Sequence, residues 1–382
     1  MNPETRILIS GAGVAGLTAA IWLAKAGYRP LLVEKAPTIR ADGFIISLSH
    51  HCYKLLGEMG VLDNLQILNN QVLASSYHDR SGRAILKLDY ERLFEAGNIV
   101  QIMRDDLEMV LFEHAKDHAD FLYSNSVSKI VQNPQNVSVS FEDGQQMEFD
   151  LVIGADGLHS RVRECAFPDA QITKHYLNLH AAAFRSPNLL GLSHKYEAYL
   201  EPRRHSIVYT TRSNELACIF IWSNAAPSVP DSTQQRIDYL NETYRGADSR
   251  ARRLIESRTP HDDLYMDVLF QIEMPRWHTG RVVLLGDAAH ALTQLSGQGA
   301  SMSIAGASTL SRALGKMPYP EAFQHYEDAI RPAITTLQPA TRKRARWYVP
   351  GGLASHYFRD WAMRFIPNEV WVRYFKSKYS NA

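Results

Sequence analysis

The sequence contains few cysteines, no long apolar segment and almost no net charge. Cys52, Cys165 and Cys218 lie far apart and form neither a CxxC pair nor a Cys/His ligand spacing, so neither a zinc site nor a disulfide framework is expected. No apolar run approaches the roughly 20 residues of a membrane-spanning helix. Since 41 Lys and Arg nearly balance 40 Asp and Glu, the chain has no general field that attracts nucleic acid or an acidic membrane. We therefore expect a small-molecule partner and no metal, nucleic acid or membrane.

The chain is long enough for two domains, or for one large α/β body with an inserted lobe. Its 382 residues are 45% hydrophobic, which suffices for a core in either arrangement. The first residues, MNPETR, lack the basic lead-in and apolar segment of a secretory signal. We expect a soluble, cytoplasmic protein that is a monomer or a homodimer.

The amino-terminal region has the pattern of a βαβ unit. Residues 6–10 (RILIS) and 31–34 (LLVE) each predict a short strand. Between them, residues 14–26 are rich in Ala and Leu and predict a helix that stops at Gly27. The junction between the first strand and the helix reads GAGVAG, which has the GxGxxG spacing of a dinucleotide-binding turn.

The glycines of this junction have separate expected roles. Gly11 permits a tight turn, Gly13 lets a pyrophosphate approach the backbone, and Gly16 lets the helix pack closely on the strand. The free N–H groups at the start of the helix would face the phosphates. The predicted phosphate-binding residues are therefore Gly11, Gly13, Val14, Ala15 and Gly16.

An acidic residue closes the second strand of the unit. Glu34 is placed to accept hydrogen bonds from a ribose diol, and an acid at this position disfavours a 2′-phosphate. NAD and FAD both remain possible on this evidence. Lys35 and Arg40, which follow Glu34, are also expected to contact the nucleotide.

Two later stretches repeat the order of strand, glycine and acidic residue. In residues 150–167, DLVIGADGLHSRVRECAF, a predicted strand leads into Asp156 and Gly157 and then into a helix. In GRVVLLGDAAH, a predicted strand delivers Gly286 and Asp287 at its carboxyl end. Open α/β sheets bind ligands at that end of their strands.

Together the three stretches resemble the dinucleotide fingerprint, the DG motif and the GD motif of the single-component, class A flavoprotein monooxygenases with the para-hydroxybenzoate hydroxylase fold. The resemblance covers most of residues 4–345. It implies an α/β protein with a Rossmann-like FAD-binding domain of the GR2 type, an inserted and mostly antiparallel β-sheet substrate domain, and a C-terminal helix.

The resemblance also assigns expected roles to individual residues. Glu34 would hold the adenosine ribose, and Asp287 the ribityl or pyrophosphate region of FAD. Arg104, in IMRDDLEMVL, resembles the family arginine that opens a helix and reaches the ribityl side. Asp156 and Gly157 resemble the pair that contacts both FAD and the nicotinamide nucleotide.

A further set of FAD contacts is expected after the GD motif. The segment SGQGA precedes a helix of small residues, so its free N–H groups can face an anion. A reduced flavin carries negative charge near N1 and O2. The predicted set therefore includes Gly286, Gly297, Gln298, Gly299 and Ala300.

The chain departs from the family pattern at two positions. Gln294 stands where the family usually has a proline that stiffens the loop beside the flavin, and Gly306 stands where it usually has an acidic residue. The first departure bears on loop rigidity and coenzyme specificity. Gly306 and the extended C-terminal segment also resemble, faintly, the tetracycline-inactivating branch of the family.

The predicted division into domains places a β-rich lobe inside the nucleotide-binding body. We assign residues 1–71, 101–174 and 273–345 to the FAD-binding domain, residues 72–100 and 175–272 to the substrate domain, and residues 346–382 to a C-terminal helical extension. Five residues of the lobe are candidates to line the substrate pocket: His180, Phe184, Tyr196, Tyr209 and Trp222. None is assigned a catalytic role.

The implied activity is oxygenation of a small molecule. In the family, NADPH or NADH reduces FAD, and O2 then forms a flavin C4a-hydroperoxide that transfers one oxygen atom to an electron-rich aromatic or polyketide-like substrate. A reductase or an oxidase of the same fold is the nearest alternative. A colourless NAD-dependent dehydrogenase and an FAD-binding protein without catalytic activity are more distant ones.

Overall fold

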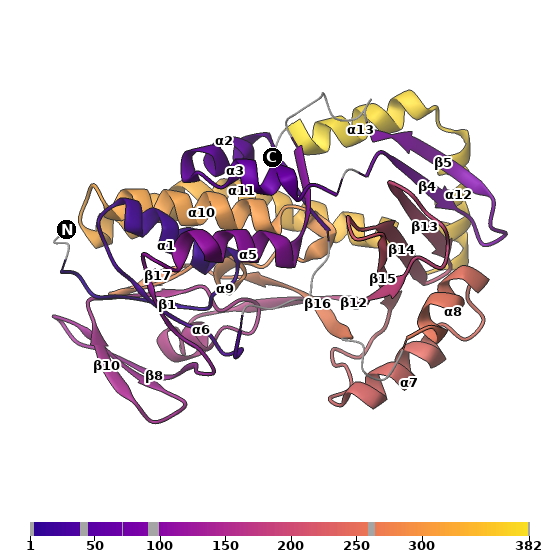
Figure 1. The fold of residues 1–382 in the computed structure, drawn as a ribbon. Coiled ribbons are helices and arrows are strands. Elements are labelled where there is room, and N and C mark those ends of the chain that lie inside the picture. Colours follow the sequence, from indigo (N-terminus) through magenta and orange to yellow (C-terminus); the bar gives the residue numbers. More distant parts are fainter. Residues whose placement is uncertain (1–3, 39–44, 71, 91–98, 259–263, 381–382) are drawn as a thin grey trace.

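In the computed structural model, the described residues are 4–38, 45–70, 72–90, 99–258 and 264–380. They form a nucleotide-binding body, a second body built on a large sheet, and a carboxyl-terminal group of helices beside that sheet (Figure 1). The sheets of the two bodies are separate hydrogen-bonded units.

A six-stranded sheet forms the base of the nucleotide-binding body. Its order is β17-β18-β11-β1-β2-β7, and every pair is parallel except β17–β18. The strands are β1 (Ile7–Ser10), β2 (Leu31–Val33), β7 (Asp120–Leu122), β11 (Leu151–Gly154), β17 (His278–Thr279) and β18 (Val282–Leu284). This order places the carboxyl ends of β1, β11 and β18 side by side, so the three sequence motifs meet at one edge of the sheet.

Helices cover one face of this sheet, and a small antiparallel sheet lies on the other side (Figure 1). The covering helices are α1 (Val14–Lys25), α5 (Arg104–Ala115), α10 (Gly299–Leu314) and α11 (Tyr319–Tyr348). The small sheet consists of β8 (Val127–Gln132), β9 (Val137–Phe141) and β10 (Gln146–Phe149), with α6 (Arg161–Ala166) packed against it. Both faces of the parallel strands are thus shielded from water, which explains their continuous apolar runs.

Short elements complete this body. Antiparallel strands β3 (Ile45–Ser49) and β6 (Ile99–Met103) pair with each other near α10, and β6 leads directly into α5. The remaining helices are α2 (His50–Met59), α3 (Leu62–Ile67), α9 (Asp287–His290) and the 3-10 turn η1 (Gln294–Ser296).

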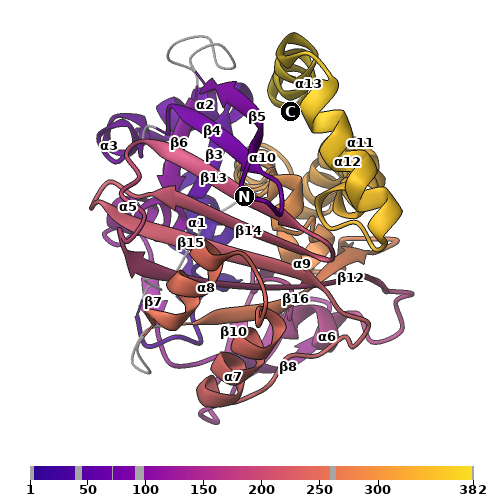
Figure 2. The same cartoon turned by 90° about the vertical axis from the view of Figure 1, so that its right-hand side faces the viewer.

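The second body is a sheet of seven strands in the order β16-β12-β15-β14-β13-β4-β5 (Figure 2). All its pairs are antiparallel except β13–β4, as the alternating sequence of this region predicted. The strands are β4 (Ala74–His78), β5 (Ala84–Asp89), β12 (Thr173–Pro187), β13 (Lys195–Glu201), β14 (Arg204–Thr210), β15 (Glu215–Ser223) and β16 (Tyr265–Glu273). Helices α7 (Thr233–Thr243) and α8 (Ser249–Glu256) pack on one face, and the other face is turned toward the end of α11.

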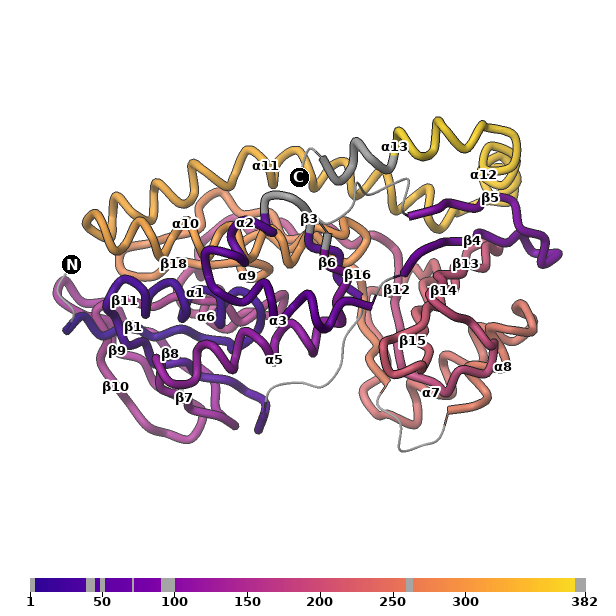
Figure 3. Tube along the Cα trace, turned by 45° about the horizontal axis from the view of Figure 1, so that its top comes forward, coloured from indigo at the N-terminus to yellow at the C-terminus, as the bar shows by residue number. Residues whose placement is uncertain are grey.

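One long helix joins the two bodies. At 30 residues, α11 is about 45 Å long, and it runs from α10 to the seven-stranded sheet, where Ala345 and Val349 pack with Ile207 and Tyr209 (Figure 3). The helix continues without a break across the predicted domain boundary at residue 345. Two further helices follow it, α12 (Leu353–Phe365) and α13 (Asn368–Ser380), and both contact β5. No helix among the described residues is both long and apolar enough to cross a membrane.

The close packing of α1 on β1 makes a direct prediction for Gly16. A Cβ atom at Gly16 would lie 1.9 Å from the carbonyl oxygen of Gly11, so Gly16→Ala must displace the first turn. We expect this change to lower the free energy of unfolding by about 1–3 kcal/mol and to reduce flavin content, as measured by thermal unfolding and by absorbance. Gly351→Ala is the control, because a Cβ there meets nothing within 4 Å. Equal stability of the two variants would contradict the argument.

Candidate functional site

A cavity of about 960 Å³ extends from the carboxyl edge of the six-stranded sheet to the face of the seven-stranded sheet. Residues from all three sequence motifs line it, together with side chains of the large sheet. Segments that lie almost 300 positions apart in the sequence thus share one cavity.

The turn after β1 packs so closely against the turn after β11 that no side chain fits between them. Gly11 has φ +103°, and a Cβ there would lie 2.5 Å from the carbonyl oxygen of Ala155 in the turn after β11. Helix α1 begins after Gly13, and no side chain among the described residues caps it. Its first N–H groups, and the positive end of its dipole, are therefore available to an anion in the cavity.

Glu34 is held beside this turn by the backbone. Its Oε2 accepts a hydrogen bond of 2.9 Å from the N–H of Ala12, and its Oε1 accepts one of 2.9 Å from the N–H of Ala36. A carboxylate oxygen can accept more than one hydrogen bond. The side chain is therefore fixed in orientation and still able to accept from the hydroxyls of a ribose.

Asp156 follows β11 on the same edge of the sheet. Its Oδ2 accepts a hydrogen bond from the N–H of Val162 at 3.0 Å, whereas Oδ1 is buried without a hydrogen-bond partner among the described residues. Burial raises the pKa of Asp156 from its ordinary value, and the hydrogen bonds from Ser160 and Val162 oppose that rise. A buried acceptor without a partner is costly in the free protein, so a donor from a ligand would stabilise it.

Arg104 and Asp287 carry opposite charges into the middle of the cavity. Arg104 opens α5, as predicted, and its Nε donates to Oε1 of Glu108 at 3.0 Å. Burial raises the pKa of Asp287, and the positive charge of Arg104 opposes this effect. Both side chains line the cavity, Arg104 from α5 and Asp287 from α9.

The loop that leads into α10 is fastened by a side chain of α11. Nη1 of Arg344 donates to the carbonyl oxygens of Leu295 at 3.3 Å and of Ser296 at 2.9 Å. Thr293, which begins this loop, has φ +64°, an uncommon backbone conformation for a β-branched residue. Because Gln294 replaces the usual proline of the family, these two hydrogen bonds supply a restraint that the loop sequence itself lacks.

The positions of the predicted cofactor residues fall into three groups. Thirteen line the cavity: Gly11, Gly13, Val14, Ala15, Glu34, Lys35, Arg104, Asp156, Gly157, Asp287, Gly297, Gly299 and Ala300. Gly16, Gly286 and Gln298 do not line it; a Cβ at Gly286 would lie 2.9 Å from Oγ of Ser303, so this residue serves close packing behind the site. Arg40 lies outside the described residues. That the thirteen bind FAD stays a prediction, since the structure tests only their proximity.

The five aromatic candidates of the lobe are divided between the two faces of the sheet. Tyr196 and Tyr209 line the cavity, with parallel rings whose centres are 6.4 Å apart. His180, Phe184 and Trp222 do not; Phe184 and Trp222 belong to the core beneath α7 and α8. Successive residues of a strand point to opposite faces, so only the pairing and the covering helices decide which aromatic residues reach the cavity.

Sequence reasoning missed several aromatic residues of the cavity wall. They are Tyr77 and Tyr90 near β4 and β5, Tyr265 and Phe270 on β16, and Tyr348 at the end of α11. Strand alternation singled out the region of Tyr77 and Phe270 but not the face to which each points. No local pattern distinguishes Tyr348, which reaches the cavity because α11 crosses from one body to the other.

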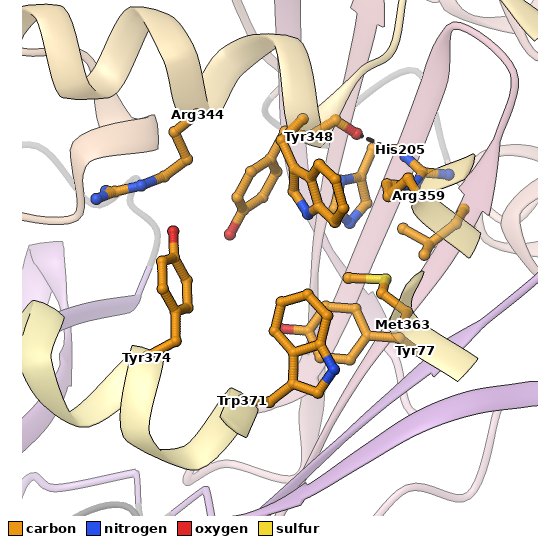
Figure 4. A pocket seen from close by; sticks show the side chains of 10 residues that line it. Tyr77, His205, Arg344, Tyr348, Arg359, Met363, Trp371 and Tyr374 are labelled. Carbon is orange, nitrogen blue, oxygen red and sulfur yellow. Dashed lines mark hydrogen bonds between the residues drawn. The ribbon is translucent and has the colours of Figure 1, made fainter. Parts of the chain in front are cut away.

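A small side pocket of about 40 Å³ adjoins the main cavity (Figure 4). Tyr77 and Tyr348 line both spaces, and the far wall of the side pocket includes His205 of β14 and Trp371 of α13. Burial lowers the pKa of His205 to about 3. The imidazole is therefore neutral near pH 7, and the pocket is predominantly aromatic.

Comparison with known proteins places this geometry in a family. The family model described as "FAD binding domain" matches residues 4–332. The chain therefore belongs to this family of class A flavin-dependent monooxygenases. This finding confirms the family, the fold class, the enzyme class and the FAD cofactor that the three motifs predicted.

Individual relatives agree with this assignment. A flavin-dependent monooxygenase of Legionella longbeachae is 30% identical over 345 residues, which are 88% of this chain and 88% of the relative. An uncharacterised protein of Mycobacterium tuberculosis is 34% identical over 80% of this chain and 83% of its own length. Among solved structures, the tetracycline destructase Tet(55) superposes with a TM-score of 0.84 at 25% identity, over 100% of this chain and 98% of its own. HpxO of Klebsiella pneumoniae, complexed with FAD and uric acid, shares the fold with a TM-score of 0.85 at 20% identity, over 99% of this chain and 97% of its own.

Glu34 provides a test of the predicted ribose contact. We expect Glu34→Gln to weaken FAD binding by roughly 10-fold and Glu34→Ala by up to about 100-fold, because hydrogen bonds to a charged group contribute about 1.5–3 kcal/mol. The dissociation constant is measured by titrating apoprotein with FAD. Glu148→Gln, on the exposed surface of β10, is the matched control. If FAD binds the Glu34 variants as tightly as this control, the predicted contact is wrong.

Arg344 provides a test of the loop restraint. Arg344→Met keeps most of the aliphatic stem but removes both hydrogen bonds to the loop, so we expect FAD to dissociate up to roughly 30-fold faster, at about 1 kcal/mol for each lost hydrogen bond. Arg346→Met, an exposed position on the same helix, is expected to leave the rate unchanged. Stopped-flow fluorescence of released FAD measures the rate, and identical rates in both variants would count against this role.

Proposed function

We propose that this chain uses FAD, NAD(P)H and O2 to oxygenate an electron-rich aromatic or enol-containing small molecule. One observation carries the proposal: a single cavity joins the nucleotide-binding edge of the parallel sheet to an aromatic wall on the large sheet. A cofactor that extends from the first turn toward α10 would present its ring at this wall. A planar ring compound that lies against the wall would then be next to the reactive part of the cofactor.

The proposed contacts to FAD follow the chemistry of the residues present. The N–H groups at the start of α1 suit the pyrophosphate, and Glu34 suits the adenosine ribose. Arg104, Asp156 and Asp287 offer one donor and two acceptors to the hydroxylated chain in the middle of the cavity. The uncapped start of α10, where Gln298 makes no side-chain cap, suits the negative charge of a reduced isoalloxazine ring. When bound, FAD supplies the redox and oxygen chemistry, and the protein supplies orientation and exclusion of water.

The aromatic wall favours a substrate with a ring and an oxygen substituent. Tyr196 and Tyr209 offer flat apolar faces. The hydroxyl oxygen of Tyr209 also accepts a hydrogen bond of 2.5 Å from the N–H of Ile45. Burial raises the pKa of Tyr90 to about 12 and also raises that of Tyr348. Both phenols therefore stay protonated near neutral pH, and the hydroxyl of Tyr348 can donate a hydrogen bond to a carbonyl or hydroxyl oxygen of the substrate.

The relatives support a ring substrate. The names of two solved structural neighbours refer to tetracycline and to uric acid, both of which are ring compounds that carry oxygen substituents. The reductant is NADPH or NADH. The sequence contains one GxGxxG turn and no second one, so a separate nicotinamide nucleotide-binding domain is not expected. The coenzyme is therefore expected to bind transiently at the open side of the cavity.

The nearest alternative is a reductase or an oxidase without oxygen insertion. To separate them, the purified protein is reduced with NAD(P)H without oxygen, and O2 uptake is then followed as phenols, quinolones and polyketides are added. A monooxygenase gives O2 uptake that a substrate stimulates and a product heavier by one oxygen atom. Uptake that no compound stimulates, with all O2 recovered as hydrogen peroxide, would identify an oxidase.

Tyr196 tests whether the wall binds the substrate. We expect Tyr196→Ala to raise KM for the oxygenated compound at least about 10-fold, since stacking and burial of one aromatic side chain contribute about 1.5–3 kcal/mol, with FAD content unchanged. Phe184→Leu is the control, because Phe184 lies in the core on the opposite face of the same sheet. An effect of the same size in both variants would indicate general damage to the sheet and not substrate contact.

A further inference from the structure

Helix α12 buries two polar side chains, His356 and Arg359, and exposes most of its aromatic side chains. His356 and Arg359 are each 1% exposed, whereas Tyr357, Phe358 and Trp361 are 60%, 61% and 55% exposed. Leu353 and Phe365 extend this outer face at 61% and 63% exposure. The outer face of α12, defined by these five apolar residues, is the reverse of an ordinary surface helix.

Buried polar contacts fix this orientation. The guanidinium of Arg359 donates to the carbonyl oxygen of Tyr348 at 2.9 Å, to Oδ1 of Asp360 at 2.9 Å and to Nδ1 of His356 at 2.8 Å. A buried arginine without these partners would be strongly destabilising. His356 and Asp360 lie on α12 itself, so rotating the helix to bury its aromatic side would break the contact with Tyr348 of α11 and would carry the buried Arg359 out of its place. The outer face of α12 is therefore held toward solvent.

The outer face of α12 forms a continuous aromatic row. The rings of Phe358 and Trp361 stack with centres 6.0 Å apart, and those of Trp361 and Phe365 are 5.8 Å apart. Figure 2 shows α12 at the margin of the molecule beside the large sheet, whose edge strand β5 it contacts, and Figure 1 shows it at the opposite end of the molecule from β1 and β17 of the six-stranded sheet. A contiguous exposed patch of this kind indicates an interaction site.

The surrounding charge is positive. Residues 341–382 contain nine Lys or Arg and two Asp or Glu, although the whole chain has a formal net charge of +1. Three of the nine are engaged elsewhere, since Arg342 pairs with Glu273, Arg344 donates to the loop before α10 and Arg359 is buried. Arg364 is exposed on α12 itself, and Arg373 is exposed on α13. Asp360, the one acidic residue of α12, is engaged with Arg359 and so does not offset the exposed charge of Arg364.

We propose that the outer face of α12 docks on the surface of an anionic lipid bilayer. Aromatic and leucine side chains beside arginines are the composition of helices that lie in the membrane interface, where the rings enter the headgroup layer and the cations meet lipid phosphates. A 13-residue helix is about 20 Å long and suits this position in the plane of the membrane. A second copy of the chain is disfavoured, because a two-fold contact would bring two positively charged segments together.

Vesicle binding by the purified flavin-loaded protein tests the proposal. We expect co-sedimentation with vesicles of 70% phosphatidylcholine and 30% phosphatidylglycerol, little binding to pure phosphatidylcholine, and release by 0.5 M salt, these compositions being chosen at about the range where electrostatic attraction dominates. The double change Trp361→Ala with Phe365→Ala should weaken binding at least about 10-fold. Trp361→Phe should still bind, but the change in tryptophan fluorescence that accompanies vesicle binding should be smaller than in the wild-type protein. The matched control is Ile67→Ala with Met147→Ala, two exposed apolar positions on other elements.

Folding of the variants is checked by flavin content and by NAD(P)H oxidation, which none of these changes should alter. The proposal is overturned if the wild-type protein ignores anionic vesicles, or if the double variant binds them as well as the control does. It is also overturned if light scattering shows a wild-type dimer that the double variant dissociates, since the face would then belong to a second copy.

Discussion

The close approach of two backbone turns is the constraint on which the site depends. Gly11 packs so tightly against Ala155 that a Cβ would overlap the carbonyl group, and this contact fixes the turn after β1 beside the turn after β11. The neighbouring strand β18 then delivers Asp287 to the same edge, because all three strands are parallel and adjacent. Dispersed short motifs become one binding surface because of this strand order.

The long helix α11 extends that surface into the second body. Its amino-terminal part packs on α10, while its last turns meet the large sheet and send Arg344 to the loop before α10 and Tyr348 into the cavity. Arg344, near the end of α11, therefore has a structural role. The sequence-based division ended the FAD-binding domain at residue 345, whereas α11 continues past that position and brings Tyr348 to the cavity.

The carboxyl-terminal helices show why composition alone misjudges a surface. The near-neutral charge of the whole chain led to the expectation of no membrane contact, yet nine of its 41 basic residues gather in the last 42 positions. The buried Arg359, which donates to the carbonyl oxygen of Tyr348 on α11, holds the aromatic side of α12 outward. This inversion is visible only in three dimensions, since the same sequence pattern would also fit a helix with its aromatic side buried.

The sequence alone determined the family, the βαβ unit, the position of the helix that begins at Arg104 and the mostly antiparallel character of the lobe. The family and the helix at Arg104 follow from the resemblance of three motifs, whereas the βαβ unit and the lobe follow from local rules: glycine where the backbone has no space, apolar runs in covered strands, and alternation in strands with unlike faces. Tertiary structure decided which side chains meet. Tyr196 and Tyr209 face the cavity while Phe184 and Trp222 do not, and Gly286 supports the site from behind, because strand pairing and the covering helices assign each face. Such assignments depend on contacts between residues far apart in the chain, which no short window of sequence contains.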